Sequence, residues 1–269
     1  ASGHVRIYQY NNNSWSQLGA DIDGEALGDY SGASVSLSSD GSRLAIGAIA
    51  NDGGGNNSGH VRIYQYNNNS WSQLGADIDG EDSGDESGYS VSLSSDGSRL
   101  AIGGYLNDGN GSSSGHARIY DYNGSAWVQV GADIDGEAAL DRSGRSVSLS
   151  SDGTRVVIGA YLNDAGNASS SDNRGHVRIY DYNGSAWVQV GADIDGEGAV
   201  DTSGSSISIS SDGTRIAIGA PFNDGNGSNS GHVRVYSISS GGSYQYAWDV
   251  DSGGSPSDGT YRATVAGAD

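Results

Sequence analysis

Several residue types are missing from this chain of 269 residues, and each absence removes some kinds of chemistry. The sequence contains no cysteine, which excludes a disulfide framework, a thiolate metal site and a cysteine nucleophile. It contains no methionine, from which we expect a processed or partial chain, and all 13 of its basic residues are arginine. No run of about 18 apolar residues is present, so the sequence predicts no transmembrane helix.

Acidic residues and glycine are in excess. The 33 acidic residues give a formal net charge of −20, which repels nucleic acid and anionic membranes and attracts cations. We therefore expect no nucleic-acid partner and no membrane insertion, and we interpret the charge as an adaptation to a salty location, extracellular or at the cell surface. The 45 glycines, with only 35% hydrophobic residues, favour many short strands joined by tight turns.

An internal repeat organises most of the chain. The string Gly-His-x-Arg-x-Tyr recurs at spacings of 56, 56, 60 and 56 residues, beginning at Gly3, Gly59, Gly115, Gly175 and Gly231. One unit predicts four strands, at 31–38, 43–47, 60–64 and 71–78. Four strands in about 56 residues is the size of a propeller blade. The sequence therefore predicts an all-β fold, a β-propeller of four-stranded blades with four to five blades in this chain.

Apolar residues that recur in the repeat are expected to form the layers between blades. In the first units these residues are Val5, Ile7, Val35, Leu37, Leu44 and Ile46. A tryptophan also recurs at one repeat position, as Trp15, Trp71, Trp127 and Trp187. A periodic tryptophan is more often a blade-packing residue than a ligand platform, and we interpret these four in that way.

The two ends of the chain do not complete the repeat. We expect a repeat propeller over residues 1–240 and divergent strands over 241–269, which either complete a blade or begin an immunoglobulin-like module. Residues 244–249 could serve as a degenerate fourth strand. The ring could close as four blades that share strands from both chain ends, as five blades with one thin blade, or with strands from a neighbouring chain.

The repeat resembles FG-GAP repeats, the blades of integrin-α-type propellers. Residues 32–35, 46–48 and 59–64 carry this resemblance, which covers residues 3 to about 238. It implies an extracellular adhesion or recognition module, often calcium-dependent. The family places calcium in the first hairpin, but here that hairpin holds one carboxylate, which is too few for calcium. We therefore interpret Asp40, Asp96, Asp152 and Asp212 as turn residues.

The remaining acids gather in loops that a propeller places on one face. The loop between blades carries four acids in each of four copies, namely Asp21, Asp23, Glu25, Asp29, Asp77, Asp79, Glu81, Asp85, Asp133, Asp135, Glu137, Asp141, Asp193, Asp195, Glu197 and Asp201. The loop between the second and third strands adds candidates at Asp108, Asn110, Asp224 and Asn226. Clustered carboxylates favour a hard cation, so we predict calcium binding through these residues. The alternative is a solvated acidic rim in which Asp and Asn cap turns.

The histidines give no catalytic signal in the sequence. All five occupy one repeat position, as His4, His60, His116, His176 and His232. A catalytic base is one residue in one special place, so five equivalent copies favour a structural hydrogen bond. We therefore expect no catalytic residues and no enzyme activity.

The repeat symmetry is broken where the loop between blades enters the first strand. The varying residues there are Tyr30, Glu86, Tyr89, Arg142, Arg145 and Thr202. Varying residues on a constant scaffold are how repeat proteins set specificity, so these are the predicted partner-binding residues. The expected function is a non-catalytic adhesion or recognition module for a glycan or protein partner. The alternative is a structural subunit of an extracellular filament or surface coat, in which copies of the chain complete each other's blades.

Overall fold

The computed structural model describes residues 1–164, 172–238 and 244–249, and these residues contain strands and no helix. Three successive blades have the same architecture. The second blade contains β5 (Ser31–Leu37), β6 (Arg43–Ala48), β7 (His60–Asn67), β8 (Ser70–Gln73) and β9 (Ile78–Asp79). The third contains β10 (Ser90–Leu93), β11 (Arg99–Gly104), β12 (His116–Tyr122), β13 (Trp127–Gln129) and β14 (Ile134–Asp135). The fourth contains β15 (Ser143–Leu149), β16 (Arg155–Ala160), β17 (His176–Tyr182), β18 (Trp187–Gln189) and β19 (Ile194–Asp195).

Each of these blades is an antiparallel sheet whose outermost strand is interrupted. In the second blade the order is β5-β6-β7-β8, and β9 also pairs with β7. The outer strand therefore consists of two short pieces with a loop between them. This interruption matters for function because it brings an acidic loop close to the first residue of β7.

The first and last blades differ from the three central ones. The first blade has only its outer part, in β1 (His4–Val5), β2 (Tyr8–Asn11), β3 (Ser14–Gln17) and β4 (Ile22–Asp23). The last contains β20 (Ser206–Ile209), β21 (Arg215–Ala220), β22 (His232–Ile238) and β23 (Tyr244–Asp249), with β23 paired to β22 as the fourth strand. The rest of the divergent C-terminal region, residues 250–269, lies outside the described residues.

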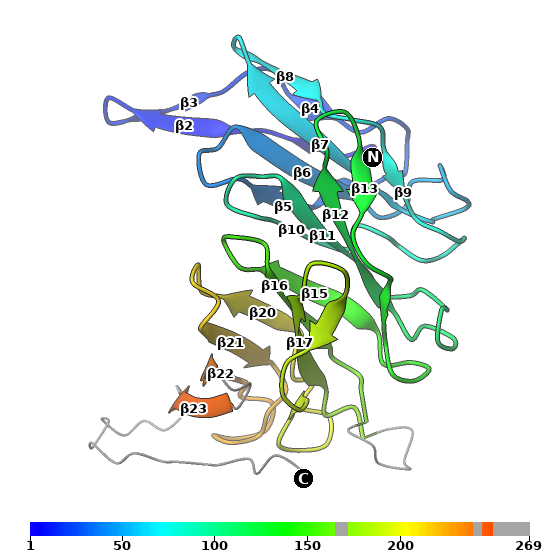
Figure 1. The fold of residues 1–269 in the computed structure, drawn as a ribbon, viewed down its shortest axis with the longest axis vertical. Helices are drawn as coiled ribbons and strands as arrows, with labels where there is room; N and C mark the ends of the chain where they lie inside the picture. Colours follow the sequence, from blue (N-terminus) through cyan, green and yellow to red (C-terminus); the bar gives the residue numbers. More distant parts are fainter. Residues whose placement is uncertain (165–171, 239–243, 250–269) are drawn as a thin grey trace.

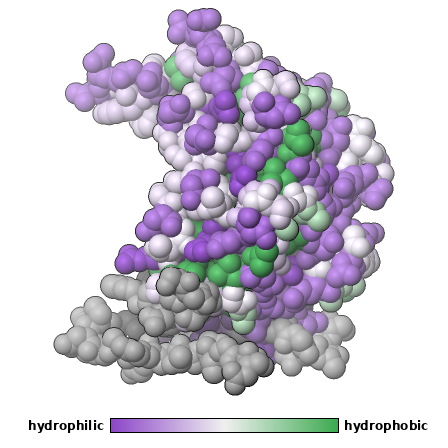
Figure 2. All heavy atoms as spheres, viewed as in Figure 1, coloured by the Kyte–Doolittle hydropathy of each residue, from purple (hydrophilic) through white to green (hydrophobic). Residues whose placement is uncertain are grey.

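The blades follow one another along an arc around an open hollow (Figures 1 and 2). In the described part of the chain, β1 to β4 do not pair with β20 to β23, so the two chain ends do not share a blade. The fold is therefore the expected all-β propeller arrangement, with three five-stranded sheets whose outer strand is in two pieces, one four-stranded sheet and one partial blade.

The core lies between neighbouring blades, as the sequence predicts. One apolar cluster joins Ile119 of the third blade to Val156 and Ile158 of the fourth. The expectation fails at the first junction, where Val35 and Leu37 remain 52% and 48% exposed. Their equivalents in the fourth blade are buried, because the third blade supplies inner strands that the partial first blade does not have.

The repeated tryptophan fastens each blade to the one before it. The indole Nε1 of Trp127 donates a 2.9 Å hydrogen bond to the carbonyl oxygen of Leu74 in the preceding blade. Trp71 and Trp187 make the same bond to Leu18 and Val130. The interpretation of these three tryptophans as blade-packing residues is confirmed, whereas Trp15 is 68% exposed at the first blade.

We expect Trp127→Phe to lower the free energy of unfolding by about 1 kcal/mol, because the Leu74 carbonyl loses its hydrogen-bond donor. For a chain of this size that loss corresponds to a melting temperature lower by about 2–4 °C. Trp15→Phe is the matched control and is expected to change stability by less than about 0.5 kcal/mol. Urea denaturation followed by circular dichroism would measure both, and equal losses would contradict the assigned role.

The carboxylates of the first hairpins close turns. Ser38 Oγ and the Ser42 backbone N–H donate to Asp40 at 2.7 and 2.9 Å. In the last blade, hydrogen bonds from Ser210 and Thr214 lower the pKa of Asp212 to about 2. The interpretation of these aspartates as turn residues is confirmed.

Candidate functional site

The structure separates the acids that the sequence grouped as calcium ligands. Asp29 is buried and accepts hydrogen bonds from the Ala26 backbone N–H and from Asn51 Nδ2, at 2.9 and 3.2 Å. Asp85, Asp141 and Asp201 make the equivalent bonds to Asn107, Asn163 and Asn223. These four carboxylates therefore join the loop between blades to the loop after the second strand, and they have a structural role.

The loop between the second and third strands also uses its polar groups internally. Asp108 Oδ1 accepts the Ser113 backbone N–H at 2.7 Å, and Asp224 Oδ1 accepts that of Asn229 at 2.7 Å. Asn110 Nδ2 donates to the carbonyl oxygens of Gly136 and Glu137, while the Asn226 backbone N–H donates to Ser230. The predicted calcium loops are therefore held by hydrogen bonds within each loop and, through Asn110, by bonds to the loop between blades.

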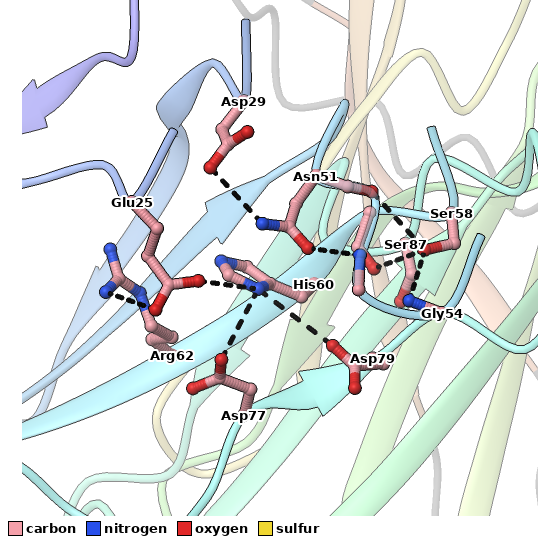
Figure 3. Close-up of polar contacts among 12 residues, drawn as sticks. Glu25, Asp29, Asn51, Gly54, Ser58, His60, Arg62, Asp77, Asp79 and Ser87 are labelled. Atoms are coloured by element: carbon pink, nitrogen blue, oxygen red, sulfur yellow. Dashed lines mark hydrogen bonds and ion pairs between the residues drawn. The ribbon is translucent and has the colours of Figure 1, made fainter. Parts of the chain in front are cut away.

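Six other acids of the predicted calcium set lie close to three of the repeated histidines. The structure forms three clusters, which we call the junction clusters: Glu25–His60–Asp77, Glu81–His116–Asp133 and Glu137–His176–Asp193. In each cluster one ligand-type atom from every residue lies within 4.8 Å of the others, so the group could bind a metal. Figure 3 shows His60 Nδ1 facing Glu25, Asp77 and Asp79.

Each junction cluster is assembled from two blades. Glu25 follows β4 of the first blade, whereas His60 is the first residue of β7 in the second blade. Asp77 lies in the loop between β8 and β9, where the outer strand is interrupted. The clusters therefore span the junctions between the first and second, second and third, and third and fourth blades.

The histidines of these clusters are buried and lack hydrogen-bond partners at Nδ1. The side chains of His60, His116 and His176 are almost fully buried, and their Nδ1 atoms have no hydrogen-bond partner. The Nε2 atoms of His116 and His176 also have none. Burial lowers the pKa of His176 to about 4 and also lowers the pKa of His60, which keeps both imidazoles neutral at neutral pH. The structural hydrogen bond expected of these histidines is therefore not made by any of the three Nδ1 atoms.

The other members of the predicted acid set take supporting positions. Asp21 pairs with Arg6 at 2.9 Å in the first blade. The main-chain carbonyls of Asp23, Asp79 and Asp135 accept hydrogen bonds from Arg62, Arg118 and Arg178. Burial raises the pKa of Asp195. Glu197 repeats the glutamate position at the junction of the fourth and last blades, 3.8 Å from His232 Nδ1.

The residues that break the repeat symmetry form a second group of contacts. We call it the Tyr–Arg network: Glu86, Tyr89, Tyr105, Arg142, Arg145 and Tyr161. It spans the third and fourth blades, where the loops between blades meet the starts of β10 and β15 and the ends of β11 and β16. Tyr105 and Tyr161 were not predicted, although Ile49, Tyr105, Tyr161 and Pro221 vary at one repeat position.

Aromatic rings and guanidinium groups alternate in this network. The Arg145 guanidinium lies 4.3 Å from the Tyr89 ring centroid and 5.5 Å from that of Tyr161. Arg142 Nη1 donates a 2.6 Å hydrogen bond to Tyr161 Oη. Within the described residues, neither Arg142 nor Arg145 forms an ion pair with a carboxylate. Two guanidinium groups therefore remain without an acidic partner in a chain of net charge −20.

Glu86 is the carboxylate of the Tyr–Arg network, and a hydrogen bond from Tyr105 positions it. The Tyr105 hydroxyl donates to Glu86 Oε2 at 3.0 Å, and the Tyr105 and Tyr89 rings pack with centroids 4.3 Å apart. Burial, with the nearby Glu86 charge, raises the pKa of Tyr105 to about 12, so its hydroxyl keeps its proton. The carboxylate and the two guanidinium groups are thus held by the same pair of blades.

The remaining two predicted partner-binding residues lie in other blades. Tyr30 is 59% exposed at the second blade, and Thr202 is buried at the fifth. Tyr30, Glu86, Arg142 and Thr202 share a left-handed backbone, with φ of 55°, 51°, 55° and 54°. The same turn therefore presents a different side chain in each blade, and only the third and fourth blades combine them into the network.

Comparison with known proteins supports the fold and changes the functional expectation. No protein-family model and no curated protein sequence matches the chain. A putative 6-phosphogluconolactonase from Bacteroides uniformis is similar in structure, with a TM-score of 0.63 at 13% identity over 92% of this chain and 65% of that one. The periplasmic gluconolactonase of Pseudomonas aeruginosa gives a TM-score of 0.59 at 15% identity, over 93% of this chain and 64% of that one.

At these identities the likeness establishes a shared propeller fold, and the chain spans about 65% of the length of the first neighbour. A second putative 6-phosphogluconolactonase, from Bacteroides fragilis, has a TM-score of 0.58 at 11% identity, over 93% of this chain and 64% of that one. All three neighbours carry the names of lactone-hydrolysing enzymes. The expectation of a non-catalytic adhesion or recognition module, with its filament-subunit alternative, is therefore wrong, as is the expectation that the chain is not an enzyme.

No helix in the described part of the chain has the length and apolar character needed to cross a membrane.

Proposed function

We propose that the chain is a hydrolase that opens the ring of a negatively charged sugar lactone, with the Tyr–Arg network as its active site. The observation that carries this proposal is the pair of guanidinium groups without acidic partners, connected through Tyr105 to a carboxylate where the repeat symmetry breaks. The lactonase names of the structural neighbours support the reaction class. The phosphorylated substrate named for two of them supports the choice of an anionic lactone.

The network holds the groups that ester-ring opening requires. In hydrolysis, a water oxygen bonds to the lactone carbonyl carbon while the ring carbon–oxygen bond breaks. The carbonyl oxygen becomes negative in the transition state, and an arginine aimed at it lowers the barrier. Glu86 takes a proton from the attacking water and returns one to the ring oxygen as it leaves, which gives a hydroxy acid. One of Arg142 and Arg145 stabilises the oxyanion and the other binds the substrate's own negative charge.

The tyrosines orient the substrate in this proposal. Tyr89 presents its ring beside Arg145, where it can pack against the C–H face of a sugar ring. Tyr105 holds one oxygen of Glu86, which leaves the other for water. The periplasmic neighbour favours an enzyme that works outside the cytoplasm.

The test is a ring-opening assay on the purified chain. Acid release is followed with a pH indicator in weak buffer, using 6-phosphogluconolactone as the charged substrate and gluconolactone as its neutral counterpart. We expect hydrolysis above the spontaneous rate, with kcat/KM about 10- to 100-fold higher for the charged lactone, because a charge-assisted bond to arginine contributes about 1.5–3 kcal/mol. Hydrolysis of neither lactone above the spontaneous rate would overturn the proposed function.

A further inference from the structure

We propose that the three junction clusters are divalent transition-metal sites that fasten neighbouring blades together, a role independent of the proposed catalysis. Each cluster offers one imidazole nitrogen and two carboxylate oxygens. Each takes its glutamate from one blade and its histidine and aspartate from the next. An ion bound to all three residues would therefore tie two blades together.

The separations within the clusters suit an ion better than a hydrogen bond. The His Nδ1 to Glu Oε2 distances are 3.9, 3.7 and 3.8 Å, and those to Asp Oδ2 are 3.8, 3.7 and 3.7 Å. Hydrogen bonds between nitrogen and oxygen end near 3.2 Å. Two ligands bound about 2.1 Å from one ion at a tetrahedral angle are about 3.4 Å apart. A contraction of a few tenths of an ångström would therefore close each cluster on an ion.

The second oxygen of every carboxylate is already held by a neighbouring side chain. Glu25 Oε1 lies 3.4 Å from Arg62 Nη1, which leaves Oε2 toward His60. Asp77 Oδ1 accepts from Gln73 Nε2 at 2.5 Å, which leaves Oδ2 toward the same imidazole. Such outer contacts are what orient metal-binding carboxylates. The same contacts recur in the other clusters, from Arg118, Gln129, Arg178 and Gln189.

The buried imidazoles supply an independent reason to expect a ligand. The Nδ1 atoms of His60, His116 and His176 are buried without a hydrogen-bond partner, and each faces its two carboxylates. Burying a polar nitrogen without a partner costs about 1–3 kcal/mol, and here that arrangement occurs three times. A metal ion at Nδ1 would give each nitrogen a partner.

The donor set selects the class of metal. Calcium prefers six to eight oxygen ligands, whereas imidazole suits zinc and its first-row neighbours. Three protein ligands leave a position for water, as zinc and cobalt accept. A hollow of about 400 Å³ adjoins the first cluster and is lined by Glu25, Asp77 and Asp79 among others, so an ion can enter from solvent.

The first blade shows the arrangement without a glutamate. Among the described residues, Asp21 Oδ2 is 2.9 Å from Arg6 Nη2, where the junction clusters turn the equivalent oxygen toward histidine. In the first blade, the arginine therefore pairs with the aspartate. In the three junction clusters, the arginine pairs with the glutamate instead, and the aspartate faces the imidazole.

The experiment uses Zn²⁺ and Co²⁺ as probes on the chelator-treated chain. We expect three ions bound per chain, a visible Co²⁺ absorption band typical of low-coordinate nitrogen and oxygen ligands, and a melting temperature at least about 5 °C higher with saturating Zn²⁺ than with EDTA. Glu81→Gln should lower the stoichiometry from three to two. Asp108→Asn removes an acid from a neighbouring loop, outside the clusters, and should leave three.

Several results would overturn the proposal. One is that neither metal binds at concentrations up to about 1 mM. Another is that Glu81→Gln leaves the number of bound ions unchanged. A third is that Ca²⁺ binds to the same sites as tightly as Zn²⁺. Glu81 has a partly exposed side chain and is not needed to fill the core, so Glu81→Gln is expected to fold. The metal experiments need no substrate, so failure here and failure of the lactone assay are separate outcomes.

Discussion

Gly144→Ala is expected to lower the free energy of unfolding by more than about 4 kcal/mol, among the larger effects for one methyl group. A Cβ at Gly144 would lie 2.0 Å from the carbonyl oxygen of His116 and 3.2 Å from Gly103 Cα. These are backbone atoms, which cannot rotate away. The φ of +82° at Gly144 adds strain for any residue with a Cβ.

The reason for the tight contact lies in how the blades meet. Gly144 is the second residue of the innermost strand of the fourth blade, and Gly103 lies in the second strand of the third. A Cβ at Gly103 would in turn lie 2.0 Å from the Gly144 carbonyl oxygen. The pairs Gly47 with Gly88 and Gly159 with Gly204 repeat this approach, so the blades meet backbone to backbone at these points.

Gly124→Ala is the matched control for this prediction. Gly124 also has a positive φ, of +98°, but nothing lies within 4 Å of its added Cβ. Gly124→Ala should therefore lower the free energy of unfolding only through the strain of a left-handed backbone, by about 1–2 kcal/mol. Urea denaturation of both variants would measure the difference. Similar losses for the two would mean that the close approach at Gly144 does not limit stability.

Much of the fold could be predicted because the same sequence pattern occurs five times in the chain. The alternation in residues 31–38 predicted the first strand, and the regular spacing predicted four strands to a blade. The exposure of Val35 and Leu37 could not be predicted from their own sequence, because it depends on inner strands that the partial first blade lacks.

The sequence predicts the acids of the junction clusters but not their histidines, and the reason is physical. The sequence pointed to Glu25 and Asp77, but it grouped them with acids near them in the chain. In the structure they meet across a blade junction, at a distance in sequence of 52 residues, and the group that joins them is His60. Five equal histidines suggested a structural hydrogen bond, yet repetition is also what a metal site at every complete junction produces.

The error about catalysis has a related cause. In a repeat protein, an active site is expected where a nucleophile, a base or a histidine departs from the repeat. The residues that do depart, such as Glu86 and Arg145, are of the kinds that also bind partners, and the sequence alone predicts that role for them. Their chemistry became visible only when Tyr105 and Tyr161 placed the carboxylate and the guanidinium groups in one network.

We expect Arg145→Ala to lower kcat/KM for a charged lactone by about 10- to 10³-fold. Loss of a charge-assisted bond to the substrate costs about 10- to 100-fold, and loss of an oxyanion-stabilising donor costs about 10²–10³-fold. Arg145 stacks on Tyr89 and bears no ion pair within the described residues, so its loss leaves no buried carboxylate unpaired. Stability should therefore change by less than about 1 kcal/mol. Lactone kinetics and thermal melting on the same preparation would measure both quantities.

The pattern across variants would distinguish catalysis from a structural role. Ser205→Ala alters the equivalent repeat position in the fifth blade and should leave kcat/KM unchanged. Glu86→Gln keeps the acceptor for the Tyr105 hydroxyl but cannot take a proton from water, so it should lower kcat and have little effect on KM. Of these two residues, only Arg145 belongs to the Tyr–Arg network. If Arg145→Ala and Ser205→Ala lowered kcat/KM equally, the active site would have to lie outside that network.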